Sequence, residues 1–571
     1  DDSNIAPHKR MNDAIHAFNC LTVAEINHGG RNANMHRTGL QPVGPSDVPN
    51  AIVGGHSLKV PTIAEIKEII GKYRDGARRA IAAGYDIISI HGAHGYLITN
   101  FLSPKYNQRT DEYGGSDENR VRLALEIYDA VRQEVGKDVP VGIRISMTED
   151  IEGGITVEQS IALIQRLEKL GLDFVDVSAG TYDTLPILIQ PMDQPQGCLL
   201  PFARQMRQNV KVPVIGAGRI NDIDLAERAL SDGDADFVHM GRAFHADPEI
   251  LAKTLRGAKE EVVGCIACNK CCSQLFSDLR SVCTVNPRAG RERTLKLIKT
   301  DRPRRVMVVG GGMAGMEAAT VAAQRGHDVT LYEKNQECGG YVTILKAPPT
   351  RKAWGRATHD RVRMLEQSGA KIVTGRVVTA ADVEAERPDV LILATGTRPF
   401  VPAYVAGSDR PHVTDYDSLI RGRVKPGSNV VVMGGQNLGM ITAEFLADKG
   451  AHVTVIEQTG ALSTDLEYMA REMLLARVNR SNQITVRLNS NVEQINDDTV
   501  IVQSGGAYET ISGIDQVVFA NVRERNTDLF EEVSLGLSER LNIQVHLIGD
   551  AEWTREPYDA MMEGTMLARA I

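Results

Sequence analysis

The chain has 571 residues, which is enough for three or more domains that each bury a core. Its formal net charge is −9, from 64 basic and 73 acidic residues spread along the chain, and nothing in this balance suggests a nucleic-acid groove. No apolar run approaches the roughly 18 residues that span a bilayer, so we expect no membrane partner. Reduced cysteines fit the cytoplasm, where we expect the protein to be located.

Up to about residue 255, near-continuous apolar runs alternate with amphipathic helical stretches. The predicted strands are 21–27, 85–91, 139–146, 174–180, 212–218 and 237–242. The predicted helices include 62–84, 118–135, 156–170 and 222–230. Apolar strands alternating with helices predict an α/β fold with a parallel sheet, here a (β/α)8 TIM barrel over residues 1–255. A barrel of this kind needs eight strands, so we expect two further β/α units before Asp1; the alternative is an open six-stranded sheet.

Residues at the ends of the predicted strands indicate a bound flavin. Gly218 ends the fifth run, and Gly241 and Arg242 end the sixth. Backbone N–H groups at such glycines, together with an arginine, form the usual phosphate site of a barrel, although strand-end glycines also make plain tight turns. Arg144 lies within the third run, and a buried guanidinium needs an anionic partner, which a reduced flavin ring would supply.

The second apolar run ends in His91-Gly-Ala-His94-Gly-Tyr96. Two histidines can polarise a carbonyl oxygen while a tyrosine delivers a proton. A lone histidine is more often structural, and a metal site is conceivable for two, but no carboxylate accompanies them at ligand spacing. We therefore interpret His91, His94 and Tyr96 as catalytic residues, and we expect the loop 182–200 to border the substrate pocket.

Five of the eight cysteines lie between residues 265 and 283. Three thiolates at two-residue gaps and a fourth after a longer loop are typical of a 4Fe–4S cluster. A zinc site is the alternative, but it usually takes two Cys-x-x-Cys pairs some 15–20 residues apart. Cys271 and Cys272 are adjacent, and Cys271 keeps the two-residue gap. The predicted ligands are therefore Cys265, Cys268, Cys271 and Cys283.

Residues 304–333 follow the order strand, glycine turn, helix, strand and acid, which is typical of a dinucleotide-binding unit. In this turn Gly310 allows the sharp bend, Gly312 admits the pyrophosphate, and Gly315 lets the helix pack on the strand. Glu333, at the end of the second strand, can bind a ribose hydroxyl.

The same unit recurs with Gly434, Gly439 and Glu457, and the interval from the first glycine to the acid is the same in both copies. Together with Asp550 near the C-terminus, the two units resemble the FAD/NAD module of the glutathione reductase class. The resemblance implies FAD on the first unit and Asp550, and a nicotinamide nucleotide on the second. Glu457, rather than a basic residue, favours NADH over NADPH.

The second unit has Gln436 where its middle glycine should stand. A side chain at this position crowds the approach of the pyrophosphate. Two interpretations follow: NADH still binds in a slightly different orientation, or the unit is a structural relic.

The run from His91 to Leu97, with Asn107-Gln-Arg-Thr-Asp-Glu-Tyr-Gly-Gly-Ser116, resembles the old yellow enzyme family. The cysteines and the C-terminal half are similar to its large iron–sulfur members, among them 2,4-dienoyl-CoA reductase, 2-enoate reductases and trimethylamine dehydrogenase. The resemblance implies FMN in the barrel, with His91 and His94 polarising a substrate carbonyl and Tyr96 as proton donor. It also implies FMN contacts at Arg144, Gly218, Gly241 and Arg242.

Glu25 departs from the pattern of many relatives, which carry Gln at this point of the barrel. A carboxylate near a flavin would disfavour the anionic reduced ring unless it is protonated. Amine-oxidising relatives tolerate an acid here, so Glu25 weakens a simple reductase interpretation.

Two functions fit these features. In the favoured one, NADH reduces FAD, a 4Fe–4S cluster carries single electrons to FMN, and FMN reduces an activated C=C bond of an α,β-unsaturated carbonyl or carboxylate. In the alternative, an amine is oxidised at FMN and the electrons leave to an external electron-transfer protein. His91 favours the reductase, whereas Glu25, Gln436 and the cysteine spacing favour the dehydrogenase. Either enzyme acts on a small molecule, and relatives range from monomers to larger assemblies, which allows a homo-oligomer.

The expected domain order follows from these motifs. A barrel over 1–255 precedes a cluster segment over 256–300. The FAD-binding domain is expected over 301–427 and 521–571, with the NADH-binding domain inserted at 428–520.

Overall fold

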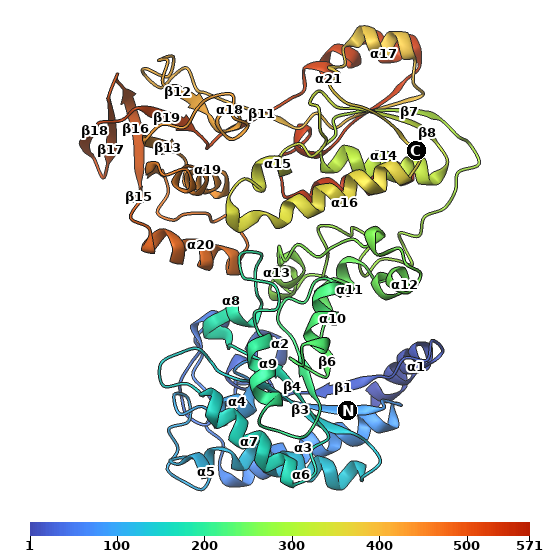
Figure 1. Cartoon of the computed structure of the whole chain (residues 1–571), viewed down its shortest axis with the longest axis vertical. Helices are drawn as coiled ribbons and strands as arrows, with labels where there is room; N and C mark the ends of the chain where they lie inside the picture. The colour runs from blue at the N-terminus through green and yellow to red at the C-terminus, as the bar shows by residue number, and fades with distance from the viewer. The chain divides into compact units, whose positions relative to one another are not determined.

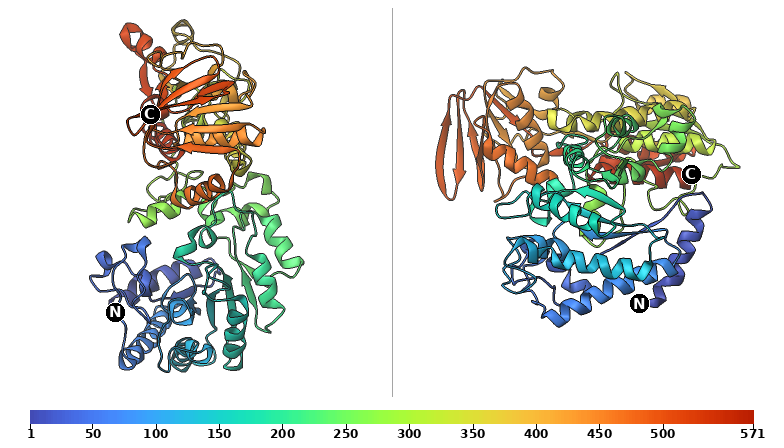
Figure 2. Two further views of the ribbon diagram at one scale, coloured as in Figure 1. Left: turned by 90° about the vertical axis from the view of Figure 1, so that its left-hand side faces the viewer. Right: turned by 60° about the horizontal axis from the view of Figure 1, so that its bottom comes forward.

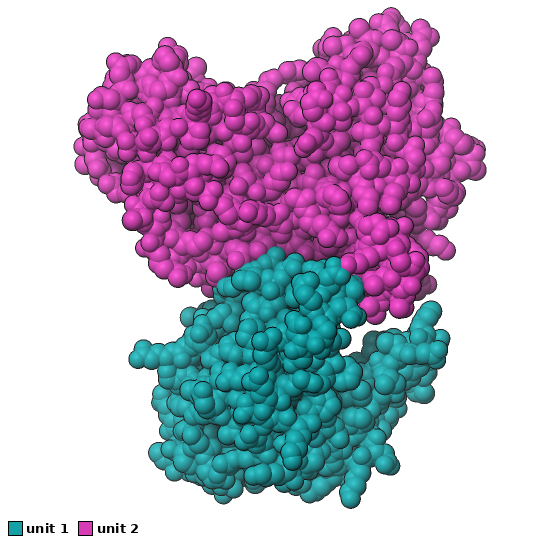
Figure 3. All heavy atoms as spheres, viewed as in Figure 1, with its two compact units in different colours: residues 1–190, 194–241 teal, residues 191–193, 242–571 magenta.

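The computed structural model describes residues 1–571, which form two compact units. Unit 1 contains residues 1–190 and 194–241, and unit 2 contains residues 191–193 and 242–571 (Figure 3). Each unit has its own buried apolar cores. None of the helices combines the length and the apolar character that a bilayer crossing requires.

Unit 1 is built on one sheet of six parallel strands that lie in chain order (Figure 1). The strands are β1 (Val23–Ile26), β2 (Ile87–Gly92), β3 (Val141–Ser146), β4 (Phe174–Ser178), β5 (Val214–Gly216) and β6 (Phe237–Val238). All six predicted strands are therefore confirmed. The sixth is shorter than expected, because helix α11 (Gly241–Ala246) begins at Gly241, inside the range that the sequence predicted to be strand.

Helices cover this sheet, as its apolar strands require. They include α3 (Ile63–Ala82), α6 (Arg122–Val135), α7 (Val157–Lys169) and α10 (Ile223–Ser231). Thr62 and Thr156 begin α3 and α7 with capping boxes, which satisfy the first free backbone N–H groups. The predicted helix 118–135 is divided, since the short α5 (Asp117–Arg120) precedes α6. Helix α1 (Ile5–His16) was not predicted, and only one of its side chains is buried.

Unit 2 contains two further parallel sheets, as the repeated glycine motif predicts. The first has the order β21 (Gln544–Leu547), β10 (Val390–Leu393), β7 (Arg305–Val309), β8 (Asp328–Tyr332) and β9 (Lys371–Val373). Helix α14 (Met313–Arg325) packs closely on α23 (Pro557–Ala570). A Cβ at Gly564 of α23 would lie 2.5 Å from the carbonyl oxygen of Ala314, so only glycine allows this approach. The C-terminal segment thus completes the first sheet and its helix layer.

The second sheet of unit 2 has the order β12 (Val413–Asp415), β19 (Gln516–Phe519), β13 (Asn429–Met433), β14 (His452–Ile456) and β15 (Ile484–Arg487). It carries helix α19 (Asn437–Asp448) after β13. A separate antiparallel sheet follows, and Figure 2 shows its long orange-red strands: β16 (Ser490–Ile495), β17 (Thr499–Ser504) and β18 (Ala507–Ser512).

A buried ion pair joins three helices of unit 2. Arg361 of α16 (Ala353–Gln367) donates to the carboxylate of Glu317 on α14, and Thr565 of α23 donates to the other oxygen of Glu317 at 2.8 Å. Arg361 and Glu317 are 3% and 4% exposed. Removing one partner of such a pair leaves a buried charge without compensation.

We therefore expect Arg361→Leu to lower the free energy of unfolding by about 3–5 kcal/mol. Calorimetric or fluorescence melting of unit 2 measures this effect. The double variant Arg361→Leu/Glu317→Leu removes both charges and should recover much of the loss. A melting temperature unchanged in Arg361→Leu would contradict the role given to this pair.

Candidate functional site

The predicted catalytic residues lie at the end of β2 and on the tight turn that follows it. His91 is in the strand, and the backbone then passes through the left-handed region at His94 (φ +64°) and Gly95 (φ +73°). A Cβ at Gly95 would lie 2.1 Å from Oγ1 of Thr181, so a side chain cannot fit there. Tyr96 is the N-cap residue of α4 (Leu97–Leu102). A non-glycine residue at positive φ is uncommon and is found more often at functional sites.

The turn brings the rings of the three predicted residues together. The His91 ring centroid lies 4.9 Å from that of His94 and 5.0 Å from that of Tyr96. His94 Nε2 is 2.7 Å from Oγ of Ser178 at the end of β4. The hydroxyl of Tyr96 lies 3.1 Å from that of Tyr182, in the loop after β4. The structure therefore assembles a histidine–tyrosine site at the carboxyl edge of the sheet, where barrel enzymes hold their reactive groups.

Both histidines are neutral at physiological pH. Burial lowers the pKa of His91 to about 3, and the Arg144 cation acts in the same direction. Burial likewise holds the pKa of His94 well below its ordinary value, with smaller contributions from Arg144 and His91. The backbone N–H of Ala93 donates to Nδ1 of His91 at 3.2 Å, so neutral His91 carries its proton on Nε2. His91 can thus donate one hydrogen bond without carrying a charge.

This burial predicts how the stability of unit 1 depends on pH. Because the folded pKa of His91 lies below the usual 6.5, the unfolded chain binds the proton first as the pH falls below 6.5. We expect His91 to cost about 1.5 kcal/mol of stability between pH 6.5 and pH 5. Urea unfolding at both pH values should show a smaller acid loss in His91→Gln than in the wild type. His36→Gln, at an exposed histidine, should leave the loss unchanged.

Glu25 on β1 faces this site. Its carboxylate lies 3.6 Å from Nε2 of His91 and 3.6 Å from Nη1 of Arg144 on β3. Arg144 Nε is 3.3 Å from Asp176, a buried acid on β4, and His239 Nδ1 is 3.4 Å from the same carboxylate. The sequence named no protein partner for the Arg144 guanidinium. In the structure it lies between two acids, Glu25 and Asp176. The charge of Glu25 is balanced by Arg144, which reduces its expected effect on a reduced flavin.

The predicted phosphate-binding residues follow two neighbouring strands. Gly218 (φ +109°) comes after β5, and Gly241 begins α11 after β6. Since β5 and β6 are adjacent and parallel, their carboxyl ends lie at the same edge of the sheet. Arg242 donates to Asn269 of the cysteine segment. Its predicted contact with FMN stays a prediction, as do those of Gly218 and Gly241.

The four predicted cluster ligands lie near one another in unit 2. Every cysteine is free of disulfide bonds. Burial raises the pKa of the Cys268 thiol to about 12, with further contributions from Cys265 and Cys271. The pKa of Cys283 is raised by burial and by the same neighbours. Buried thiols so close together would be costly as separate thiolates, and an iron–sulfur centre would neutralise them. No three His, Cys, Asp or Glu side chains are arranged as ligands of a single ion.

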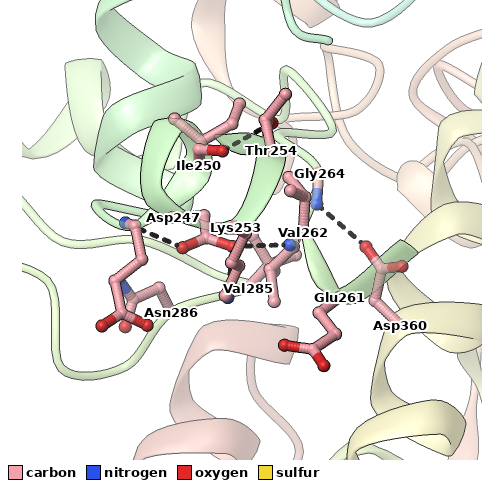
Figure 4. Close-up of polar contacts among 12 residues, drawn as sticks. Asp247, Ile250, Lys253, Thr254, Glu261, Val262, Gly264, Val285, Asn286 and Asp360 are labelled. Atoms are coloured by element: carbon pink, nitrogen blue, oxygen red, sulfur yellow. Dashed lines mark hydrogen bonds and ion pairs between the residues drawn. The ribbon is translucent and has the colours of Figure 1, made fainter. Parts of the chain in front are cut away.

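Two buried acids fix the backbone immediately before the first of these cysteines (Figure 4). Asp247 accepts from Val263 N at 2.8 Å and from Lys253 Nζ at 2.7 Å. Asp360 of α16 accepts from Gly264 N at 2.9 Å. Both carboxylates are at most 3% exposed, so the segment leading into Cys265 is held from both sides.

The first nucleotide unit has the expected geometry. Gly310 adopts φ +110°, and a Cβ there would lie 2.2 Å from the carbonyl oxygen of Ala394. A Cβ at Gly315 would lie 1.9 Å from the carbonyl oxygen of Gly310. Glu333 is buried and accepts from the N–H of Gly311 at 2.7 Å. Close backbone contacts thus explain the glycines at positions 310 and 315, and the binding of a dinucleotide by Gly310, Gly312, Gly315 and Glu333 stays a prediction.

Asp550 lies at the same unit, because a Cβ at Gly549 would contact Ala314 of α14 at 2.9 Å. Its carboxylate accepts from Arg523 at 2.7 Å, and the Arg523 guanidinium stacks 4.2 Å above the ring of Tyr341. The predicted FAD ligand is thus already paired with a cation.

The second unit repeats this geometry at its glycines. Gly434 adopts φ +111°, a Cβ at Gly439 would lie 1.8 Å from the carbonyl oxygen of Gly434, and Glu457 accepts from Gly435 N at 2.6 Å. Gln436 is the N-cap residue of α19, and its amide oxygen accepts from Thr464 N at 2.9 Å.

The sequence profile of the NADH:flavin oxidoreductase / NADH oxidase family matches residues 1–261, and that of the pyridine nucleotide-disulphide oxidoreductases matches residues 304–547. Over 100% of its length, the chain is 36% identical to the NADH oxidase of Thermoanaerobacter brockii and covers 87% of that relative. The chain belongs to the NADH:flavin oxidoreductase / NADH oxidase family. It is an oxidoreductase with a flavin barrel and a pyridine-nucleotide module, and the predicted old yellow enzyme resemblance is confirmed.

Other members of the group have known structures or activities. The fold matches that of 2-naphthoyl-CoA reductase with a TM-score of 0.94 at 32% identity, over 100% of this chain and 88% of that chain. It matches the histamine dehydrogenase of Rhizobium sp. 4-9 with a TM-score of 0.89 at 27% identity, over 100% and 86% of the two chains. The cinnamate reductase of Clostridium sporogenes is 31% identical over 95% of this chain and 83% of its own length.

Several site residues could not be named from the sequence. Tyr182 was expected only to border the pocket, and Asp176 appeared as one polar residue in an apolar strand. Asp247 and Asp360 are distant in sequence from the cysteines, and their hydrogen bonds go to the backbone just before Cys265. Only the polar position of Asp176 inside a buried strand carried a usable signal.

Proposed function

We propose that this oxidoreductase reduces the activated C=C bond of an α,β-unsaturated carbonyl or carboxylate, with NADH as the source of electrons. The observation that carries the proposal is the neutral His91–His94 pair, with the Tyr96 ring centroid 5.0 Å from that of His91. A neutral imidazole N–H can bind a carbonyl oxygen and stabilise the negative charge that develops on it during reduction.

The chain's own groups divide the chemistry in a simple way. His91, through Nε2–H, polarises the carbonyl with the help of His94, and the Tyr96 hydroxyl protonates the α-carbon. Tyr182 holds the Tyr96 hydroxyl at 3.1 Å and replaces its proton. When bound, FMN would supply hydride chemistry at the β-carbon, FAD would supply hydride acceptance from NADH, and a 4Fe–4S cluster would supply single-electron transfer.

The residues suited to hold these groups are those described above. Arg144, Gly218, Gly241 and Arg242 would hold FMN, with Glu25 at the same edge of the sheet. The four thiols Cys265, Cys268, Cys271 and Cys283 would hold the cluster. The glycine turn of α14 with Glu333 and Asp550 would hold FAD, and the turn of α19 with Glu457 would receive NADH.

Anaerobic half-reactions test the proposal. The pure protein is reduced with dithionite and mixed with 2-cyclohexenone or cinnamate, and the return of flavin absorbance is followed. We expect rapid reoxidation with formation of the saturated product. Failure to reoxidise with any enone or enoate, together with bleaching of the oxidised protein by dimethylamine, would sink the proposal.

The second candidate is an amine dehydrogenase that passes electrons to an external electron-transfer protein. The position of Glu25, 3.6 Å from His91 at the substrate face, favours it, because a carboxylate there could bind an ammonium group. The similarity to histamine dehydrogenase is consistent with this alternative. We rank it second because Arg144 lies at the same 3.6 Å from Glu25 and competes for its charge.

A further inference from the structure

The two nucleotide units of this chain have the same backbone where a pyrophosphate would bind. Gly312 is the N-cap residue of α14 with φ −77° and ψ −176°, and Gln436 is the N-cap residue of α19 with φ −76° and ψ −178°. The loop after the acid returns to the turn in the same way, since Gly339 N donates to Gly311 O and Ser463 N donates to Gly435 O. Differences between the units therefore arise from side chains and from the loop beyond this hydrogen bond.

In the first unit the space beside the turn is open. A Cβ placed on Gly312 would meet no atom nearer than Cα of Gly340, at 4.0 Å. Gly312 and Gly340 thus lie on the two sides of the space in which a pyrophosphate would approach the N-terminus of α14. This arrangement leaves room for phosphate oxygens against the backbone N–H groups.

In the second unit side chains close the same space. Gln436 replaces Gly312, and Thr464 stands as far from Gln436 along the chain as Gly340 stands from Gly312. The Gln436 amide oxygen accepts from both N and Oγ1 of Thr464 at 2.9 Å, and its Nε2 donates to Ala461 O at 3.3 Å. These bonds fasten the loop 459–465 across the turn.

Asp465 completes the closure with a negative charge. Its Oδ1 accepts from the N–H of Asn437, the first residue of α19, at 2.8 Å. The N-terminus of a helix binds anions because its first N–H groups are free and its dipole is positive there. A carboxylate of the chain already satisfies one of these donors and would repel an incoming pyrophosphate.

We infer that Gln436 and Asp465 are affinity-determining residues of the second unit: they form a latch that a pyridine dinucleotide must displace in order to bind. The inference rests on the proposed function in one respect, namely that this unit is where NADH enters. Glu457 makes the same contact as Glu333 in the first unit, since each accepts from the N–H of a turn glycine, so the predicted ribose ligand is present in both units.

The latch predicts that the wild-type protein binds a pyridine dinucleotide weakly and that mutation of Gln436 or Asp465 tightens this binding. The apparent Kd equals the intrinsic Kd divided by the fraction of molecules in the binding-competent state, so a small fraction gives weak binding. Opening the latch should therefore tighten binding, whereas mutation of an ordinary ligand would weaken it. We expect Gln436→Gly and Asp465→Ala each to lower the Kd by about tenfold, and the double variant to lower it further.

Calorimetric titration of the oxidised holoenzyme with ADP-ribose measures this effect, because the probe carries the pyrophosphate and cannot reduce the flavins. Asp448→Ala, at the exposed far end of α19, is the matched control and should leave the Kd unchanged. Asp465→Asn keeps an acceptor for Asn437 N without the charge and should give an intermediate Kd. Melting curves show whether each variant is folded.

The inference is overturned if wild-type protein binds ADP-ribose as tightly as the two variants, if the variants bind it more weakly, or if the double variant still does not bind. Its failure is distinct from failure of the proposed function. Reoxidation of dithionite-reduced enzyme by an enone does not require the nucleotide unit. Its rate should therefore be the same in wild type and in the latch variants.

Discussion

Tyr96→Phe should lower the rate of enone reduction by about 10²- to 10⁴-fold, the range that a positioned general acid contributes. The phenyl ring keeps the contact with His91 at the start of α4 but has no proton to give. Reduction of the flavins by NADH does not involve this hydroxyl and should proceed at the wild-type rate. Stopped-flow measurement of the two half-reactions separates these effects, and equal rates in variant and wild type would show that Tyr96 is not the donor.

Tyr182→Phe tests the hydroxyl that supplies the Tyr96 proton. It removes the hydroxyl 3.1 Å from that of Tyr96 and leaves the donor itself in place. Burial and the Tyr96 hydroxyl raise the pKa of Tyr182, so it is a neutral donor at physiological pH. We expect a fall of about tenfold, with a solvent isotope effect larger than that of the wild type, because the proton on Tyr96 is replaced more slowly. An identical loss in both variants would mean that the hydroxyls act as one unit.

The sheets of this chain could be predicted from the sequence because local patterns determine them. Apolar runs that alternate with helical stretches predicted all six strands of unit 1, and the two glycine motifs predicted β7 and β8 in one sheet of unit 2 and β13 and β14 in the other. Backbone sterics at Gly310 and Gly434, which both adopt φ near +110°, leave little choice of residue. The structure at such positions can be predicted from a few neighbouring residues.

The polar partners of the site could not be predicted, because they depend on how distant segments meet. Arg144 pairs with Asp176 across adjacent strands, and Gly264 N is bound by Asp360. Neither pairing has a fixed spacing in sequence. Asp465 is the sharpest example, since only the folded loop shows that its carboxylate reaches the helix that Gln436 begins. The substitution at Gln436 was visible in the sequence, and its consequence was not.

The position of Glu25 changes the balance between the two candidate functions. The sequence alone made this acid an argument against a reductase, because a carboxylate would oppose negative charge on a flavin. In the structure its charge lies 3.6 Å from the Arg144 guanidinium, and Asp176 lies on the other side of that cation. Glu25 and Arg144 therefore act as a pair, and the neutral histidines decide which chemistry the site favours.

A second large effect is expected at the cysteines. Cys268→Ser or Cys283→Ser should reduce bound iron and acid-labile sulfide to background, since each removes a buried thiol that we predict to be a cluster ligand. Iron content and the low-temperature spin resonance spectrum of the reduced protein measure the loss independently of activity.

Comparison of Cys271→Ser with Cys272→Ser identifies the third ligand. The two sulfur atoms lie 3.9 Å apart, so either variant leaves one thiol near the same position. The regular spacing favours Cys271, and we therefore expect Cys271→Ser to lose the iron and Cys272→Ser to keep it. The opposite result would assign the ligand to Cys272 and break the two-residue spacing. If both variants kept full iron content, neither thiol would be required as a ligand. If all four serine variants bound one zinc ion and no iron, the prediction of a 4Fe–4S cluster would be wrong.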